Sequence, residues 1–402
     1  MLFSFALILS TSILLGTLFQ KIHFPQLFGF MLVGILLGPY CLNWIDTSIL
    51  QNSAEIRRFA LIIILIRAGL NLDLDALKKV GRPAILMCFL PATFEIVGFV
   101  VLGPIIFHLS VIDSLILGSV LAAVSPAVVV PNMLKLIDEK YGTEQGIPQL
   151  IMAGASVDDV FVIVLFTSFT TLATSGSMDV MNFLRIPTSI LFGITSGCIL
   201  GIIINQCFQK IKIRNEVKVI LLLSILFVLV KVEDLCTGHI AYSGLLAIMS
   251  MATMIHIKDN LLSKELSSIY SSIWIVAEIL LFVLVGACVD IQYASMSLLQ
   301  SITIIFGALL FRMIGVYLCV IGTKLSNKER LFCMIAYTPK ATVQAAAGSI
   351  PLSLGLTCGN VVLTVAVCAI LITAPLGAFF IHLLYPKLLR KDDSTNNTFG
   401  KI

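Results

Sequence analysis

The sequence predicts an all-α polytopic membrane protein, and three observations support this fold class. First, 58% of the 402 residues are hydrophobic and only 12% are charged, whereas an average soluble protein has about 45–50% apolar and about 25% charged residues. Second, a single soluble core stops growing near ~250–300 residues, so this much apolar sequence must face lipid. Third, the apolar runs lack the alternating pattern of barrel strands, and lipid requires every backbone polar group to be paired internally. A soluble globular enzyme is therefore excluded.

About thirteen apolar runs are long enough to cross a hydrocarbon layer of ~30 Å as helices. The first run lacks the basic start and the cleavage site of a secretory signal, so we count it as a retained span. The expected spans are residues 2–20, 25–42, 56–71, 84–107, 112–134, 147–174, 187–208, 217–232, 240–255, 269–289, 298–321, 329–350 and 360–384. The connecting loops are short, so we expect one membrane domain followed by a polar tail at residues 387–402.

The basic residues predict the orientation of the chain. An odd number of spans places the two termini on opposite sides, and cytoplasmic loops are enriched in Lys and Arg. Most of the 26 basic residues fall in loops or at span ends on the side of the carboxyl terminus, and only Arg57, Arg58, Arg185 and Lys231 fall in loops or at span ends on the other side. We therefore expect the amino terminus outside and the carboxyl terminus in the cytoplasm. The net charge of +4 is too small and too dispersed to suggest a nucleic-acid partner.

Seven charged residues lie well inside the expected spans, away from the span ends. A charge at mid-membrane costs at least ~2.5–3.5 kcal/mol on insertion scales, which makes each of these residues a functional candidate. They are Arg67, Glu95, Asp158, Asp159, Glu278, Arg312 and Lys340. The acids and bases nearly balance, as expected if most of them are paired and one negative site remains to hold a cation.

The adjacent acids Asp158 and Asp159 are the strongest functional signal. Neighbouring carboxylates within a helix repel each other, so their titration must be coupled. Successive side chains on a helix point about 100° apart, so one acid can face an internal base while the other faces a water-filled cavity. Such a carboxylate can hold a proton or a hard cation such as Na⁺ or Li⁺. The alternative, a solvated position at a helix end, conflicts with the apolar run from Val160 to Phe166.

Two spans are interrupted near their midpoints by proline. Pro126 and Pro131 lie in the fifth span and Pro339 lies in the twelfth, and proline removes a backbone donor and clashes with the preceding turn. Unwound segments supply half-helix dipoles and free carbonyls at the depth where an ion is held, and Ser125 is a further candidate oxygen ligand for Na⁺ or Li⁺ there. Simple proline kinks are the alternative.

The order of these features suggests an inverted repeat. Spans four to six carry Glu95, the first break and the acids, and spans eleven to thirteen, seven spans later, carry Arg312 and the second break. An odd offset makes the two triplets antiparallel, which is typical of secondary transporters.

The buried bases need partners within the protein. Arg312 and Lys340 each require an acid, for which Asp158 and Glu95 are the candidates. For Arg67 and Glu278 we expect a structural ion pair or a hydrated position. None of the ten cysteines forms a C-x-x-C pair, and no histidine and cysteine cluster suggests zinc. We expect free thiols and no cofactor.

Four motifs together resemble those of the NHA-type sodium/proton antiporters of the monovalent cation:proton antiporter superfamily. They are Ile64–Leu70, Val124–Pro131, Gly154–Asp159 and Pro339–Ala345. The resemblance implies a homodimer with scaffold helices at 1–83 and 209–297, core repeats at 84–174 and 298–386, and a linker helix at 175–208. The chain lacks the long amino-terminal region of animal members, which suggests a bacterial protein of the inner (plasma) membrane.

The resemblance also implies roles for individual residues. Asp159 resembles the principal ion-binding carboxylate and Asp158 its partner, a pair associated with electrogenic exchange of two protons for one cation. Glu95 and Arg312 resemble a core ion pair, and Lys340 resembles the core lysine beside the unwound helix. Glu278 departs from the family pattern, in which this position is uncharged, and this leaves the pH dependence open.

The sequence therefore predicts a secondary-active antiporter that expels Na⁺ or Li⁺, takes up protons and contacts membrane lipids. A potassium/proton antiporter and a cation-coupled symporter of an organic anion remain alternatives within transport. A channel would need a continuous polar pore. An intramembrane hydrolase would need two acids from separate helices, and no nucleophile-and-base constellation is present, so we expect no enzyme.

Overall fold

The computed structural model describes residues 1–21, 24–71, 81–175, 180–211, 213–236 and 242–391. Every regular element in this part of the chain is a helix, and the only β-type pairing is an isolated bridge between Tyr141 and Lys391. The predicted all-α class is confirmed. Most of the polar tail expected at 387–402 and the start of the linker expected at 175–208 lie outside the described residues, as does the side chain of Arg185.

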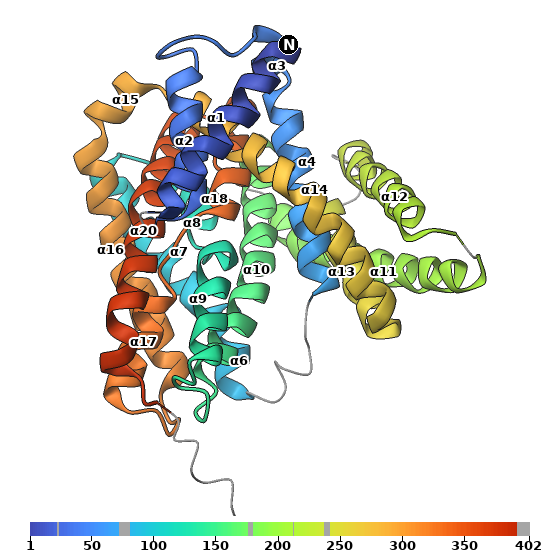
Figure 1. Ribbon diagram of the computed structural model, residues 1–402. Coiled ribbons are helices and arrows are strands. Elements are labelled where there is room, and N and C mark those ends of the chain that lie inside the picture. The colour runs from blue at the N-terminus through green and yellow to red at the C-terminus, as the bar shows by residue number, and fades with distance from the viewer. Residues whose placement is uncertain (22–23, 72–80, 176–179, 212, 237–241, 392–402) are drawn as a thin grey trace, which may run out of the picture.

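The helices follow one another with short connections (Figure 1). In chain order they are α1 (Leu2–Lys21), α2 (Gln26–Leu37), α3 (Thr47–Gln51), α4 (Ser53–Leu70), α6 (Arg82–Met87), α7 (Leu90–Ile106), α8 (Val111–Leu121), α9 (Pro126–Asp138), α10 (Ile147–Ser175), α11 (Val180–Lys210), α12 (Asn215–Cys236), α13 (Gly244–Lys258), α14 (Asn260–Ala287), α15 (Ile291–Met296), α16 (Leu298–Val320), α17 (Asn327–Ala336), α18 (Thr342–Ala347), α19 (Ile350–Ser353) and α20 (Gly359–Leu388).

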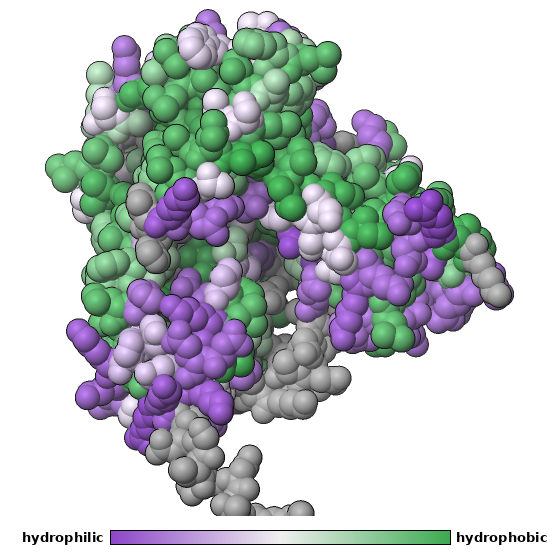
Figure 2. All heavy atoms as spheres, in the orientation of Figure 1, coloured by the Kyte–Doolittle hydropathy of each residue, from purple (hydrophilic) through white to green (hydrophobic). Residues whose placement is uncertain are grey.

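Eight helical stretches of the described residues are long and apolar enough to cross a membrane. They are Leu2–Lys21, Arg82–Ile106, Val111–Asp138, Ile147–Thr174, Leu191–Lys210, Asn260–Ala287, Leu298–Val320 and Gly359–Leu388. The helices at the other five expected spans are shorter, more charged or interrupted, so the count of thirteen stays a prediction. Figure 2 agrees with a membrane protein, since hydrophobic side chains cover most of the upper part of the visible face and hydrophilic ones gather toward its lower ends.

The long helices pack in two groups. On one side α7 lies along α16, while α11 lies along α13 on the opposite side, at the right of Figure 1. Glycines at four-residue spacing permit the close approach of α11 and α13. A Cβ atom on Gly193 would lie 2.7 Å from the carbonyl oxygen of Ser243, and one on Gly201 would lie 2.6 Å from that of Met251. Small residues of this kind let backbones approach where lipid provides no hydrophobic driving force.

Two non-helical segments interrupt the first of these groups. Residues 122–125 separate α8 from α9, and residues 337–341 separate α17 from α18. In the first, Ser125 is extended (φ −88°, ψ 111°), because the residue before a proline is disfavoured in the α region. The helix then resumes at Pro126 and continues through Pro131, so this unwound segment ends earlier than the run of prolines suggested.

Both interruptions lie where the hydrophobic interior divides into two buried clusters. Ala123 and Ala341 belong to the larger cluster, while Val124 and Tyr337 belong to the smaller one. The backbone thus crosses from one cluster to the other within the two breaks. Polar backbone groups freed at these points are buried and must find partners inside the protein.

Candidate functional site

Five of the charged residues singled out from the sequence are buried around the two breaks. Glu95 comes from α7, the acids Asp158 and Asp159 from α10, Arg312 from α16, and Lys340 from the segment between α17 and α18. Arg312 and Asp158 are 0% exposed and even Asp159 is only 7% exposed. Segments distant in sequence therefore meet at one interior site.

Four of these five residues form a connected set of ion pairs, called here the charge network (Glu95, Asp158, Arg312 and Lys340). Arg312 donates from Nη1 to Glu95 Oε2 at 2.8 Å and from Nη2 to Asp158 Oδ2 at 2.9 Å. Lys340 Nζ donates to the same Glu95 oxygen at 2.6 Å. Two acids and two bases thus compensate one another, which is the condition for keeping charges in a water-poor interior.

Arg312 also binds backbone at both breaks. Its guanidinium donates to the carbonyl oxygens of Ala122, at the end of α8, and of Tyr337, at the end of α17. It lies over the Tyr337 ring, 4.8 Å from the centroid. The last carbonyls of a helix have no partner within that helix, so a five-donor guanidinium suits a position between two helix ends.

The breaks also contact each other directly. The Ser125 N–H donates to the Pro339 carbonyl oxygen at 2.8 Å, and the Val124 N–H donates to Asp158 Oδ2 at 2.9 Å. The Lys340 N–H donates to Thr373 Oγ1 of α20 at 2.9 Å. Backbone groups that no helix satisfies are therefore used to hold an acid and to join the two interruptions.

Asp159 stands apart from the charge network. No described residue forms a salt bridge with it, and its Oδ1 has no hydrogen-bond partner among them. Four further buried oxygens near the breaks are unpartnered in the described structure. They are Asp158 Oδ1, Ser125 Oγ, Thr342 Oγ1 and Gln344 Oε1. Carboxylate, hydroxyl and amide oxygens are the donors that hard cations prefer.

The described residues contain no group of three or more His, Cys, Asp or Glu side chains that could hold a metal ion. At the breaks, the unpartnered oxygens are those of the two neighbouring carboxylates and of neutral hydroxyl and amide groups. All ten cysteines are free, as expected from their spacing.

Arg67 and Glu278 lie outside the charge network. Both are half-buried, and no salt bridge within 4 Å joins them in the described structure. The Arg67 guanidinium instead lies over the ring of Trp274, 5.4 Å from the centroid, on the same helix α14 that carries Glu278. The sequence left two expectations open for Arg67 and Glu278, a structural ion pair or a hydrated position. The structure does not form the direct ion pair.

The sequence analysis missed three residues of the site. Tyr337, Thr373 and Gln344 contribute contacts to the breaks, yet none carries a formal charge. A signal did exist for Gln344, because an amide side chain inside the small apolar run Ala341–Ala347 needs a buried partner. Tyr337 and Thr373 resemble ordinary residues of membrane helices and give no such signal.

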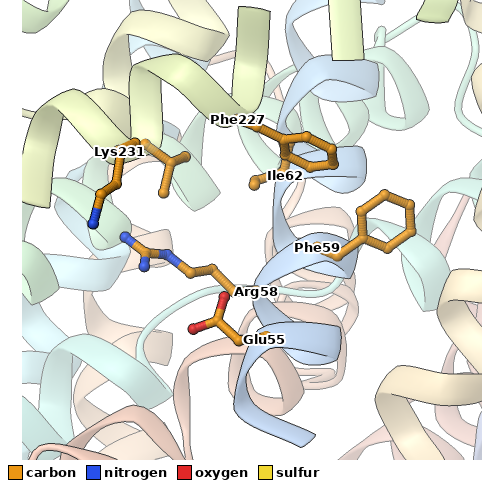
Figure 3. Close-up of a pocket in the computed structure, with 7 residues that line it drawn as sticks. Glu55, Arg58, Phe59, Ile62, Phe227 and Lys231 are labelled. Atoms are coloured by element: carbon orange, nitrogen blue, oxygen red, sulfur yellow. The ribbon is translucent and has the colours of Figure 1, made fainter. Parts of the chain in front are cut away.

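A cavity of about 220 Å³ opens elsewhere, between α4 and α12. Figure 3 shows Arg58 and Lys231 extending toward each other, with Glu55 beside Arg58 and the rings of Phe59 and Phe227 nearby. None of its seven lining residues belongs to the charge network. This cavity is therefore separate from the buried charge network, and its lining combines charged and aromatic side chains.

Comparison with known proteins agrees with the geometry. The long apolar helices are those of a multi-pass integral membrane protein. Residues 7–385 match the family described as "Sodium/hydrogen exchanger, transmembrane", and the chain belongs to this family. The resemblance inferred from the motifs is thereby confirmed.

Relatives with similar sequences carry the same description. The chain is 35% identical to "Sodium/hydrogen exchanger 9B2" of Homo sapiens over 385 residues, covering 92% of this chain and 71% of the relative. It is 32% identical to "Sodium/hydrogen exchanger 9B1" of Macaca fascicularis, covering 97% and 79%. These relatives are named as exchangers and not as enzymes.

A solved structure has the same fold. The sodium proton antiporter MjNhaP1 from Methanocaldococcus jannaschii aligns with a TM-score of 0.81 at 21% identity, over 96% of this chain and 97% of that one.

Proposed function

We propose that the protein is a secondary-active monovalent cation:proton antiporter that exchanges Na⁺ or Li⁺ for protons. The observation that carries this proposal is the isolation of Asp159 beside a charge network that is already balanced. An ionised carboxylate buried without a basic partner is strongly unfavourable. Asp159 must therefore be neutralised by a bound proton or a bound cation, and competition between the two is the chemistry of exchange. Its partner Asp158 supplies a second carboxylate.

Alternating access follows from the same charge argument. With Asp159 occupied, no unpaired carboxylate remains and the core can move through the low-dielectric interior, whereas the empty site carries a buried, unpaired charge and cannot do so cheaply. We propose that the core repeats at 84–174 and 298–386 move against a scaffold formed by 1–83 and 209–297. In this scheme thirteen spans and two crossing broken helices form an inverted repeat. The direct contacts between the breaks and the packing of α7 along α16 support a core that moves as one body.

Two vicinal acids also support an electrogenic cycle. If two protons enter for each cation expelled, one net charge moves inward, and ~100 mV of inside-negative potential contributes ~2.3 kcal/mol per cycle. At ~1.4 kcal/mol per tenfold ratio, this sustains a cation gradient of several tens-fold.

We further propose that the protein is a homodimer in a bacterial plasma membrane. Its amino terminus lies outside, its carboxyl terminus lies in the cytoplasm, and its apolar faces contact lipid.

The test is cation-induced proton release from proteoliposomes loaded with a pH-sensitive dye. Wild-type protein is expected to respond to Na⁺ or Li⁺, and Asp159→Asn is expected to abolish the response. Asp138→Asn makes the same chemical change at an exposed position at the end of α9 and serves as the matched control. Normal exchange by Asp159→Asn would contradict the assignment of Asp159 as the ion-binding carboxylate.

Two extensions of this assay separate the remaining alternatives. A response to K⁺ alone would favour potassium/proton exchange. This test is needed because the oxygen ligands of the site do not by themselves determine which monovalent cation binds. A cycle insensitive to an imposed membrane voltage would contradict the two-to-one stoichiometry.

A further inference from the structure

Gln344 makes an unusual set of contacts from the short helix α18. Its side chain is 0% exposed. Its Nε2 lies 2.9 Å from the carbonyl oxygen of Ala123, 3.2 Å from that of Leu121 and 3.3 Å from that of Val120. Three carbonyl oxygens around one amide group fix its orientation, because the reversed amide would face them with its own oxygen. One side chain thus binds the end of α8, where the helix leaves its last carbonyls without partners.

One of these carbonyls connects Gln344 to the acids. The Ala123 carbonyl and the Val124 N–H belong to the same planar peptide group, and that N–H donates to Asp158 Oδ2 at 2.9 Å. The peptide is therefore held from both ends, by the Gln344 amide on its oxygen and by the Asp158 carboxylate on its nitrogen. Hydrogen bonds in such a chain polarise one another.

From this geometry we infer that Gln344 is a positioning residue of the ion site, acting on Asp158 through the peptide group of Ala123 and Val124. This inference rests on the proposed antiport function. Gln344 does not touch either acid. Its amide fixes the rotation of the peptide plane, and the plane fixes the direction of the N–H that Asp158 Oδ2 accepts. With Oδ2 also bound by Arg312, the other oxygen, Oδ1, is left free for the transported cation.

The position of Gln344 makes it a link between the two breaks. It follows Lys340 by four residues and lies in α18, the helix that begins directly after the second interruption, whereas the peptide it holds belongs to the first. Any displacement of α18 relative to α8 would turn that peptide and change how Asp158 is presented. A purely structural residue at this place would stabilise the fold without affecting how tightly the cation binds.

The experiment compares the KM for the cation with the maximal exchange rate in proteoliposomes. Gln344→Met keeps the length of the side chain and removes its donors, and it is expected to raise the KM about tenfold, ~1.4 kcal/mol, with the maximal rate within about twofold of wild type. Gln344→Asn keeps an amide that is one methylene too short, and an intermediate KM is expected. Gln300→Met is the matched control, because Gln300 is an exposed amide that donates to one helix-end carbonyl, that of Ile106, at 3.4 Å.

The outcomes separate the inference from the function beneath it. If wild-type protein exchanges no cation, the proposed antiport function itself is contradicted. Wild-type exchange together with an unchanged KM in Gln344→Met, or a loss confined to the maximal rate, would overturn the positioning role alone. Should Gln344→Met fail to fold, Gln344→Asn decides the question, because a wild-type KM in that variant contradicts the inference.

Discussion

Acids and bases lie inside apolar helices in two regions of the molecule. The two regions differ in how deeply these charges are buried and in whether they are paired. In the charge network each base lies within 2.9 Å of an acid and every member is at most 1% exposed. Around Trp274, Arg67 and Glu278 are half-buried and form no direct pair. The difference teaches that complete burial demands compensation, whereas partial exposure lets water and an aromatic face serve instead.

Replacing Arg312, the central base of the charge network, should have the largest effect on stability. Arg312→Met leaves Glu95 with only Lys340, removes the ion-pair partner of Asp158 and frees carbonyls at both breaks. Breaking a buried pair in this way costs about 3–5 kcal/mol, so we expect poor yield and a strongly lowered melting temperature in detergent, together with lost exchange. A melting curve like that of wild type would contradict the view that the network holds the two breaks.

The two vicinal acids offer a sharper comparison within one turn of α10. Asp158→Asn weakens two bonds to a charged acceptor, from Arg312 and from the Val124 N–H, and should lower stability by about 1.5–3 kcal/mol. Asp159→Asn removes an acid with no salt bridge among the described residues, so its melting temperature should equal or exceed that of wild type. Both variants should lose exchange, and equal melting temperatures would mean that Asp158 has no structural role.

Lys340→Met tests a base whose acid retains a second partner. Glu95 would still accept from Arg312 at 2.8 Å, so we expect a loss of about 1–2 kcal/mol, less than for Arg312→Met. The network would keep one excess negative charge next to Asp159, and exchange should be impaired even where the protein folds. Melting temperature and proteoliposome exchange measured on the same preparation check both parts. A loss as large as that of Arg312→Met would mean that Glu95 depends mainly on the lysine.

The sequence was sufficient to predict features that are energetically costly inside a membrane. Charges in apolar runs are expensive, so the sequence marked Glu95, the acids, Arg312 and Lys340 as candidates, and the structure buries all of them. Proline chemistry predicted interruptions in two spans, and residues 122–125 and 337–341 are non-helical in the structure. It did not reveal that the first ends at Ser125 and that the helix then continues through Pro131, because a proline inside a helix can be tolerated where neighbours satisfy the freed carbonyl.

Contacts made through backbone carbonyls could not be predicted from the sequence, for a physical reason. Every residue has a carbonyl, so nothing in the sequence marks those of Ala122 and Tyr337 as the ones Arg312 binds, or that of Ala123 as the partner of Gln344. Pairing between charged side chains can be argued from residue type and number. The exact set of partners depends on the helix ends that the fold brings together, and this explains why uncharged site residues were missed.

Replacing the half-buried base should have the smallest effect. Arg67→Met removes a cation over an aromatic ring, an interaction worth about 0.5–1 kcal/mol at partly exposed positions, and leaves no acid that was directly paired with it. We expect a melting temperature close to wild type in detergent, with Arg67→Lys closer still because it keeps the charge over Trp274. If Arg67→Met destabilised the protein as much as Arg312→Met does, the contrast between the two regions would fail. Burial alone would then not decide which charges require a partner, and Arg67 and Glu278 would have to be coupled strongly across the gap between them.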